Sequence, residues 1–241
     1  MARVTVVHDP AFADAAAQRI AERIAQSIAA RGAATVSLTG GHTPQAAYEA
    51  LADRSRPWRT RVEWERVDLF WGDERHVPPD HPDSNYGMAD RALVQHVPIP
   101  PEHVHRIPAE RADARAAAAD YASQVPDVFD VMLLGLGDDC HIASIFPGSE
   151  LLRTAARLDR VAAVFVAHLD TWRITVTPAV ILDARAILMI VGGAPKAAAV
   201  AAAIEGPLDV GKYPGQLLRR AGSRVEWLLD DAAAADLQQR G

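Results

Sequence analysis

Short runs of apolar residues alternate along the chain with longer segments in which apolar residues recur every three or four positions. The apolar runs have the length of β-strands and lie at 4–7, 33–38, 67–71, 129–134, 160–166, 173–177, 186–191 and 225–229. The segments with helical spacing lie at 9–31, 43–53, 84–96, 113–125 and 195–204. In the first of these segments, Ala16, Ile20, Ile24 and Ile28 form one apolar stripe, which is typical of a helix with one buried face.

This alternation predicts an α/β fold with three layers, α/β/α, around a mainly parallel, Rossmann-like central sheet. The run at 129–134 is apolar throughout, as expected for a central strand that is buried on both faces. A length of 241 residues is compatible with one large domain or two small ones. Because the chain shows no repeat and no low-complexity linker, we expect residues 1–241 to form a single domain.

Four of the predicted strands are followed by turns rich in glycine or charge, at 39–43, 72–75, 135–141 and 192–196. In open α/β sheets, ligands bind beyond the carboxyl ends of the strands. We therefore expect these four turns to meet at one crevice and to form the binding site.

The first turn, Thr39-Gly40-Gly41-His42-Thr43-Pro44, joins a strand to a helix. Glycines let the backbone approach a ligand, and the N–H groups that begin a helix attract anions, so a phosphate site is one interpretation. A tight connection that only requires flexible residues is the other. We expect Thr43 to cap the helix and Pro44 to be its first residue. Neither a dinucleotide fingerprint nor a P-loop is present.

The second turn places four polar residues, Asp73-Glu74-Arg75-His76, directly after a strand of large apolar residues. Arg75 has two parallel donors that suit a phosphate, and Asp73 or Glu74 can orient Arg75 or bind sugar hydroxyls. A surface turn with local ion pairs explains the same residues.

The third turn carries Asp139, Cys140 and His141 just after the most apolar strand. A histidine titrates near neutral pH and can serve as a general base, and Asp139 is close enough to orient it. Most histidines are structural or exposed, but position favours His141 over the other eight. Cys140 is a poor candidate for a nucleophile, because neighbours in sequence usually point apart and no base is then beside the thiol.

The fourth turn, Gly192-Gly193-Ala194-Pro195, leads into Lys196 at the start of a helix. A cation there opposes the helix dipole, which suggests an anionic ligand, although many such lysines simply extend into solvent. We expect no metal site, since the chain has no His-Glu-x-x-His motif, no pair of cysteines and no tight cluster of histidine and aspartate on one helix face.

Composition excludes several classes of protein. Hydrophobic residues make up 49% of the chain and charged residues 23%, which is ordinary for a globular protein. The formal net charge of -6 and the lack of a basic face disfavour nucleic-acid binding. No apolar stretch approaches the length of a membrane span, and residues 1–10 have no apolar core of signal-peptide length, so we expect no membrane partner. A single cysteine suits a reducing compartment, and we expect the protein to be cytoplasmic.

Taken together, the turns resemble those of the 6-phosphogluconolactonases, which share a superfamily with the glucosamine-6-phosphate deaminases. Residues 39–44 stand where that family has Ser-Gly-Gly-Ser-Thr-Pro, and 71–75 match its Trp-Gly-Asp-Glu-Arg. Residues 135–148 match Gly-x-Gly-x-Asp-Gly-His-x-Ala-Ser-Leu-Phe-Pro-Gly, and 173–177 and 192–197 also fit. The match runs from about residue 10 to 230. Five motifs in the right order are far more specific than any one of them.

Three residues depart from the family pattern. Cys140 stands where the family has a glycine before the histidine, in a turn that favours glycine. His42 replaces a serine of the first motif, and Asp183 replaces an asparagine that often follows the Arg-x-Thr-x-Thr strand. Each departure affects local geometry, but none removes His141.

The resemblance implies hydrolysis of 6-phospho-D-glucono-1,5-lactone, with His141 as general base on water and Asp139 holding its tautomer. It also implies that Arg75, Lys196 and the backbone N–H groups around 40–43 bind the phosphate. The full set of implied substrate-binding residues is Gly40, Gly41, His42, Thr43, Asp73, Arg75, Gly192 and Lys196. A lactone is an activated ester, so we expect no cofactor, no metal and no covalent nucleophile. Because the chain is acidic overall, the phosphate site must be locally basic. The partner is then a small sugar-phosphate lactone, and the protein is a monomer or a homodimer.

Two other functions remain open. The deaminases carry Asn-Glu-Pro-Gly after the histidine, where the glutamate supports ring opening, whereas this chain has Ile145-Phe146-Pro147-Gly148. Loss of that carboxylate favours lactone hydrolysis over isomerisation of an amino sugar. A non-catalytic sugar-phosphate regulator could keep the anion-binding residues and lose the base, but here His141 is present.

Overall fold

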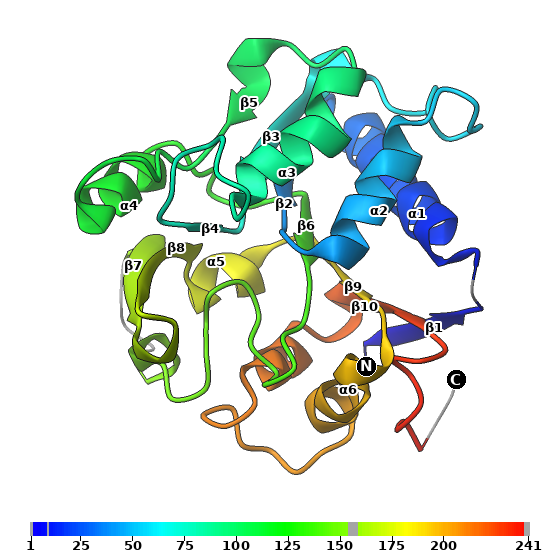
Figure 1. Cartoon of the computed structure of the whole chain (residues 1–241). Coiled ribbons are helices and arrows are strands. Elements are labelled where there is room, and N and C mark those ends of the chain that lie inside the picture. Colours follow the sequence, from blue (N-terminus) through cyan, green and yellow to red (C-terminus); the bar gives the residue numbers. More distant parts are fainter. Residues whose placement is uncertain (1, 9, 154–158, 239–241) are drawn as a thin grey trace.

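A parallel sheet of seven strands forms the centre of the computed structural model, which describes residues 2–8, 10–153 and 159–238 (Figure 1). In order across the sheet, the strands are β1 (Arg3–Val7), β10 (Val225–Asp230), β9 (Ala186–Val191), β6 (Val131–Leu134), β2 (Ala34–Leu38), β3 (Val67–Trp71) and β5 (Val104–His105). All neighbouring pairs run parallel. The predicted parallel sheet is therefore confirmed, including the central position of β6.

Helices cover both faces of this sheet. The helices of the described residues are α1 (Phe12–Arg31), α2 (His42–Ala52), α3 (Asn85–Ala92), α4 (Ala114–Ala122), α5 (Pro178–Asp183) and α6 (Ala197–Ile204). Short 3₁₀ segments are η1 (Trp64–Arg66), η2 (Val94–His96), η3 (Pro101–His103), η4 (Glu150–Leu152), η5 (Ala167–Leu169), η6 (Ala194–Lys196) and η7 (Pro214–Arg224). In Figure 1, α1 and α2 lie on one side of β9 and β10, and α6 lies on the other. This arrangement confirms the three layers.

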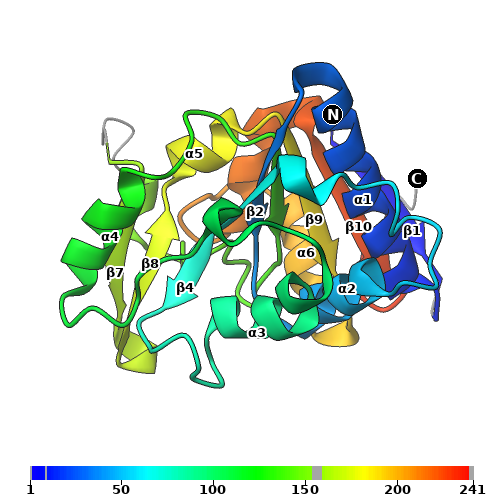
Figure 2. The same ribbon diagram turned by 90° about the horizontal axis from the view of Figure 1, so that it is seen from above.

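A second, smaller sheet has three antiparallel strands, β4 (Asp73–Arg75), β8 (Thr171–Val176) and β7 (Val161–Val166). Figure 2 shows it at one side of the main sheet, next to α4. The strands predicted at 160–166 and 173–177 exist, but they pair with each other as a hairpin. Only η5 separates them, and a short turn can join antiparallel strands but not parallel ones.

The sequence prediction missed three short elements. It assigned 72–83 to a loop, whereas Asp73–Arg75 is the strand β4. It also omitted β5 and α5, which are two and six residues long. Such short elements contain too few residues to show a hydrophobic period.

One part of the core lies between α1 and the sheet. Ile20 and Ile24 of the predicted stripe are buried, as are all four residues of β6. Complete burial of one such isoleucine stabilises the fold by about 1.5–3 kcal/mol relative to an exposed one. The core thus fixes the strands whose carboxyl ends carry the turns.

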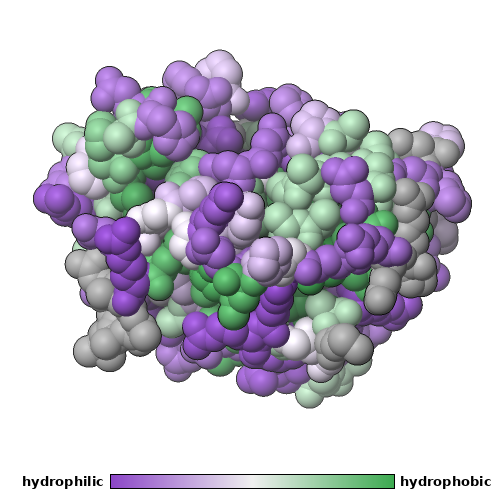
Figure 3. Space-filling view, turned by 90° about the horizontal axis from the view of Figure 1, so that it is seen from below, coloured by the Kyte–Doolittle hydropathy of each residue, from purple (hydrophilic) through white to green (hydrophobic). Residues whose placement is uncertain are grey.

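The surface is mixed in character. Figure 3 shows hydrophilic residues spread over the face seen from below, among smaller hydrophobic areas. Within 2–8, 10–153 and 159–238, none of the helices has both the length and the apolarity that crossing a bilayer requires.

Candidate active site

The four turns meet at a cavity of about 430 Å³ at the carboxyl ends of β2, β6 and β9, with β4 at its side. Its lining includes nine residues singled out from the sequence: Gly40, Gly41, His42, Thr43, Asp73, Arg75, His141, Gly192 and Lys196. The expected convergence of the turns is therefore confirmed. Asp139 does not line this cavity, but borders a neighbouring groove together with Phe146 and Trp172.

Gly41 begins the helix α2 and shapes the first turn. Its φ of 110° lies in the region that favours glycine, and its carbonyl accepts the N–H of Gln45 at 3.0 Å. The helix therefore starts at His42, and the prediction that Thr43 caps it was wrong, because Thr43 already lies inside the helix. No side chain in the described part of the protein caps this end. Its first N–H groups lie beside the cavity and are suited to an anion.

Gly40 is required by close packing rather than by its dihedral angles. A Cβ on Gly40 would lie 1.8 Å from the Asn85 Oδ1 atom, so any other residue would displace Asn85. Asn85 in turn donates its Nδ2 hydrogen to the Asp73 carbonyl at 2.9 Å. The first turn, α3 and β4 are thus locked together around the cavity.

Asp73 and Glu74 are buried and organise the second turn. The Asp73 Oδ2 atom accepts a hydrogen bond from Ser144 Oγ at 2.6 Å, which links β4 to the turn after β6. The Glu74 carboxylate accepts the backbone N–H groups of Asn85 and Tyr86 at the start of α3. Burial raises the pKa of Glu74, and these hydrogen bonds oppose the shift. Glu74 is therefore a structural anchor for α3 and not a surface ion pair.

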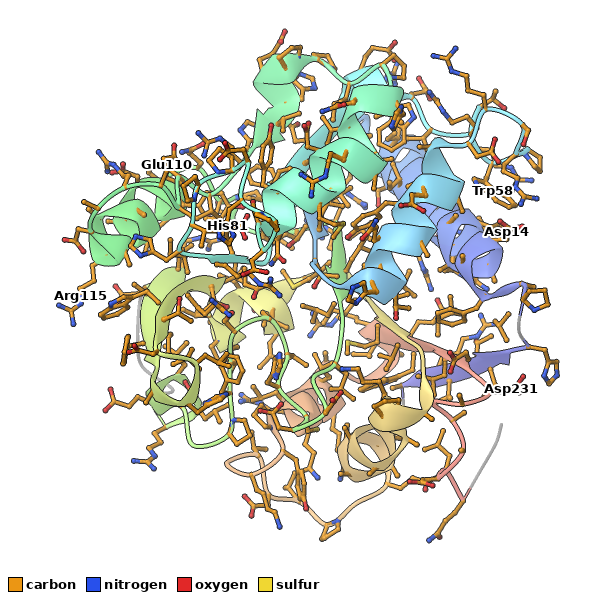
Figure 4. The ribbon with its side chains drawn as sticks, in the orientation of Figure 1. Asp14, Trp58, His81, Glu110, Arg115 and Asp231 are labelled. Carbon is orange, nitrogen blue, oxygen red and sulfur yellow. The ribbon has the colours of Figure 1, made fainter. Side chains whose placement is uncertain are left out.

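Arg75 reaches the cavity from the end of β4. One of its guanidinium nitrogens donates to the Asp83 carbonyl at 2.7 Å, in the loop that also carries His81 (Figure 4). Register places Arg75 opposite Arg173 of β8. Burial, and then the charge of Arg75, lower the pKa of Arg173. Arg75 lines the cavity and Arg173 is its neighbour on β8, so both residues contribute positive charge on this side of the cavity.

His141 lines the cavity, and its ring is held by Asp139. The His141 Nδ1 atom lies 2.6 Å from Asp139 Oδ1, which also accepts the backbone N–H of His141 at 3.1 Å. Burial is the largest single influence and opposes ionisation of Asp139, but the two hydrogen bonds and the charge interaction with His141 together hold the pKa of Asp139 below its ordinary value. With Nδ1 engaged, Nε2 is the ring nitrogen left to act on a ligand.

Two backbone hydrogen bonds close the turn that carries His141. Gly137 donates its N–H to the His141 carbonyl, and Cys140 donates to the Gly137 carbonyl, both at 2.9 Å. A Cβ on Gly137 would lie 2.0 Å from His141 Nδ1, so only glycine fits there. The ring of Phe146 lies 4.3 Å from that of His141. The imidazole is fixed from several directions.

Cys140 is not placed as a nucleophile. Its side chain is buried, with Sγ 3.6 Å from the Ala199 carbonyl, and burial raises the pKa of the thiol to about 11. Its φ of 70° explains why the family pattern has glycine at this position. Of the other two departures, His42 lines the cavity, while Asp183 is exposed at the end of α5 and does not.

Lys196 lies directly before α6, and its Nζ atom lies 2.5 Å from Asp138 Oδ1. Its backbone N–H binds the Gly193 carbonyl, and Gly193 in turn donates to Asp230 at 2.7 Å. Sequence reasoning missed both Asp138 and Asp230, since nothing in the spacing of isolated aspartates indicates such pairs. Among the residues that the structure describes, no three His, Cys, Asp or Glu side chains gather as a metal site would require.

Known proteins resemble this chain over most of its length. The family model described as glucosamine-6-phosphate isomerases/6-phosphogluconolactonase matches residues 8–227. The 6-phosphogluconolactonase of Nostoc sp. is 38% identical over 218 residues, which is 86% of both chains. That of Streptomyces coelicolor is 38% identical over 244 residues, 93% of this chain and 90% of its own.

Solved structures agree with these matches. The 6-phosphogluconolactonase from Trypanosoma brucei superposes with a TM-score of 0.84 at 30% identity, over 98% of this chain and 99% of that one. A monomeric glucosamine-6-phosphate deaminase reaches a TM-score of 0.82 at 21% identity over 98% of this chain and all of its own, a likeness that shows the fold alone.

Proposed function

Because the chain belongs to the glucosamine-6-phosphate isomerase/6-phosphogluconolactonase family, we propose a function and a mechanism for it. It hydrolyses 6-phospho-D-glucono-1,5-lactone to 6-phospho-D-gluconate, a step of the pentose phosphate pathway, with His141 as general base. The observation that carries this assignment is His141, which lines the cavity together with Arg75 and Lys196 and whose Nδ1 atom is held 2.6 Å from Asp139.

In the first step, His141 Nε2 takes a proton from a water molecule as the water oxygen bonds to C1 of the lactone. In the second, the C1–O bond of the ring breaks and the imidazolium returns the proton to the ring oxygen. The new carboxylic acid then loses its proton to solvent. Acid–base catalysis of this kind accelerates a reaction by about 10²–10⁴-fold.

Asp139 supports both steps without exchanging a proton. Its hydrogen bond places the imidazole hydrogen on Nδ1, which leaves the Nε2 lone pair available for water. Because the pKa of Asp139 is lowered, its carboxylate stays charged at neutral pH and stabilises the imidazolium that forms. Asp139 is thus a positioning residue, and His141 is the catalytic residue.

The phosphate is held by groups from three elements that line the cavity. Arg75 offers two parallel donors, Lys196 offers a point charge, and the start of α2 offers backbone N–H groups from 41–43. Arg173 behind Arg75 adds positive potential. Binding energy from this remote group fixes the carbonyl against His141 and lowers the entropic barrier to attack.

The deaminase alternative lacks its proton carrier here. Where the deaminase pattern has a glutamate, the chain has Ile145-Phe146; Ile145 is fully buried and Phe146 packs on His141. An apolar wall beside the base suits hydrolysis of a neutral lactone, and it offers no second group for ring opening.

The chemistry of an activated ester leads us to propose that the reaction needs neither a metal nor a cofactor. Full activity after dialysis against EDTA is the expected result, and loss that zinc or magnesium restores would contradict it. We propose that the protein is a monomer or a homodimer and that it is cytoplasmic.

The test is a direct assay of the purified protein with freshly prepared lactone, following acid release above the spontaneous rate. Turnover that is abolished in His141→Ala supports the proposal. Binding of 6-phosphogluconate without turnover would instead indicate a sugar-phosphate regulator. Release of ammonia from glucosamine 6-phosphate would indicate a deaminase.

A further inference from the structure

Two neighbouring carboxylates in the turn after β6 each hold one side chain that lines the cavity. Asp139 binds the ring of His141, and Asp138 binds Lys196, with 2.5 Å between Asp138 Oδ1 and Lys196 Nζ. The two aspartates differ in exposure, because the Asp138 side chain is 66% exposed and that of Asp139 is 43% exposed. One turn therefore contacts both the base and a cation of the proposed phosphate site.

Asp138 is held by one ion pair, whereas Asp139 is held by two hydrogen bonds. Asp139 receives both the ring and the backbone N–H of His141, so it cannot leave without breaking two hydrogen bonds. Within the described part of the chain, Lys196 is the one side chain found against Asp138. The backbone beneath is closed by the Cys140–Gly137 hydrogen bond, so the Asp138 side chain can turn away without moving His141.

We propose that Asp138 is a built-in competitor for the phosphate site: in the free protein its carboxylate occupies the Lys196 ammonium, and the phosphate of the substrate must displace it. This inference rests on the proposed function, in which Lys196 binds that phosphate. Asp138 thereby sets how tightly phosphorylated ligands bind, and it leaves the reacting end of the site untouched.

A phosphate can displace Asp138 from Lys196, whereas a simple carboxylate cannot. The phosphate dianion carries more charge than Asp138 and also receives N–H groups at the start of α2, which Asp138 is not seen to reach. Asp138 is tethered beside Lys196 at a high effective concentration, so free carboxylates do not displace it readily. Metabolites that lack a phosphate are therefore kept off Lys196.

The competition affects substrate and product alike, because both carry the same phosphate. Interactions of equal strength in the ground and transition states change KM and leave kcat unaltered. An exposed ion pair is weak, so its removal corresponds to about a two- to five-fold change in a dissociation constant. We expect Asp138→Asn to lower KM for the phosphorylated lactone by about that factor and to leave KM for unphosphorylated gluconolactone unchanged.

The experiment measures the affinity of inorganic phosphate and of 6-phosphogluconate by calorimetry in four proteins: wild type, Asp138→Asn, Lys196→Met and the double variant. Asp80→Asn serves as control, since it also removes a negative charge from an exposed loop residue and tests whether net charge alone explains the change. We expect both ligands to bind about two- to five-fold more tightly in Asp138→Asn. We expect the double variant to bind both ligands no more tightly than Lys196→Met does. We expect Asp80→Asn to bind them no more tightly than wild type does.

The outcomes separate the inference from the proposed function. If Lys196→Met weakens phosphate binding but Asp138→Asn leaves it equal or weaker, Asp138 orients Lys196 and the inference is overturned alone. An equal gain in Asp80→Asn also overturns it, in favour of net charge. If Lys196→Met binds phosphate as well as wild type, the proposed phosphate site is wrong, and the inference fails with it.

Discussion

The two ends of the cavity are built in different ways. The end with the base is one continuous turn, in which backbone hydrogen bonds, the Asp139 carboxylate and the Phe146 ring all fix His141. The end that we propose for the phosphate is assembled from α2, β4 and the start of α6, which are far apart in sequence. Proton transfer needs one group in one place, whereas an anion can be held by several donors that share the charge. Substitutions should therefore affect kcat at one end and KM at the other.

The largest expected effect comes from the base. His141→Ala should lower kcat by at least about 100-fold, because the imidazole acts only in the transition state. KM should stay within a few-fold of wild type, since the phosphate donors are intact. Steady-state kinetics of a variant with wild-type circular dichroism provides the measurement. Near-normal turnover would mean that another group activates the water.

Loss of a phosphate donor should affect KM rather than kcat. Lys196→Met or Arg75→Met should each raise KM by roughly 10- to 100-fold, since a charge-assisted hydrogen bond contributes about 1.5–3 kcal/mol. Arg75→Lys is the matched control, because it keeps the charge and loses the two parallel donors. A fall in kcat with unchanged KM in either Met variant would contradict the division of the cavity into two ends.

Asp139 tests whether the base needs its neighbour. Asp139→Asn keeps the shape but removes the charge that stabilises the imidazolium, and we expect kcat to fall by about tenfold or more. The pKa of Asp139 is lowered, so the wild-type carboxylate contributes its stabilisation at neutral pH and loses it only as acid protonates it. The acid limb of the kcat profile should therefore change shape in the variant. An unaltered profile and rate would make Asp139 dispensable.

The smallest expected effect is at Cys140. Cys140→Ser should keep activity within about twofold, because no thiol chemistry is required. The raised pKa of about 11 also predicts that iodoacetamide reacts slowly with the native protein at pH 8 and quickly after unfolding. Rapid alkylation that follows the loss of activity would revive the nucleophile interpretation.

The sequence predicted the main sheet well, because buried parallel strands such as β6 and β9 are apolar throughout and their ends carry recognisable turns. It failed at β4, where Asp73–Arg75 is polar and held by pairing with β8 rather than by any local pattern. It also chose Thr43 over Gly41 as the cap of α2, since side-chain preference does not reveal a backbone angle.

The site residues, like the strands, could be predicted only where a local sequence pattern marks them. Residues on the strand-end turns, such as His141 and Lys196, could be found because those turns are defined by their place after a strand. Partners that come from elsewhere could not be found. The link between Asp73 and Ser144 joins two turns, and the one between Asp230 and Gly193 joins neighbouring strand ends. Only the folded chain brings them together.

The most direct test of the two-ended cavity is the ratio of kcat/KM for 6-phosphogluconolactone to that for unphosphorylated gluconolactone. It should be measured in wild type, His141→Ala, Arg75→Met and Lys196→Met. We expect His141→Ala to lower both rates and to leave the ratio unchanged, because the base does not contact the phosphate. We expect the ratio to fall by roughly 10- to 100-fold in Arg75→Met and in Lys196→Met. A ratio that is the same in all four proteins would contradict the account, and the anion site would then have to lie at the start of α2 alone.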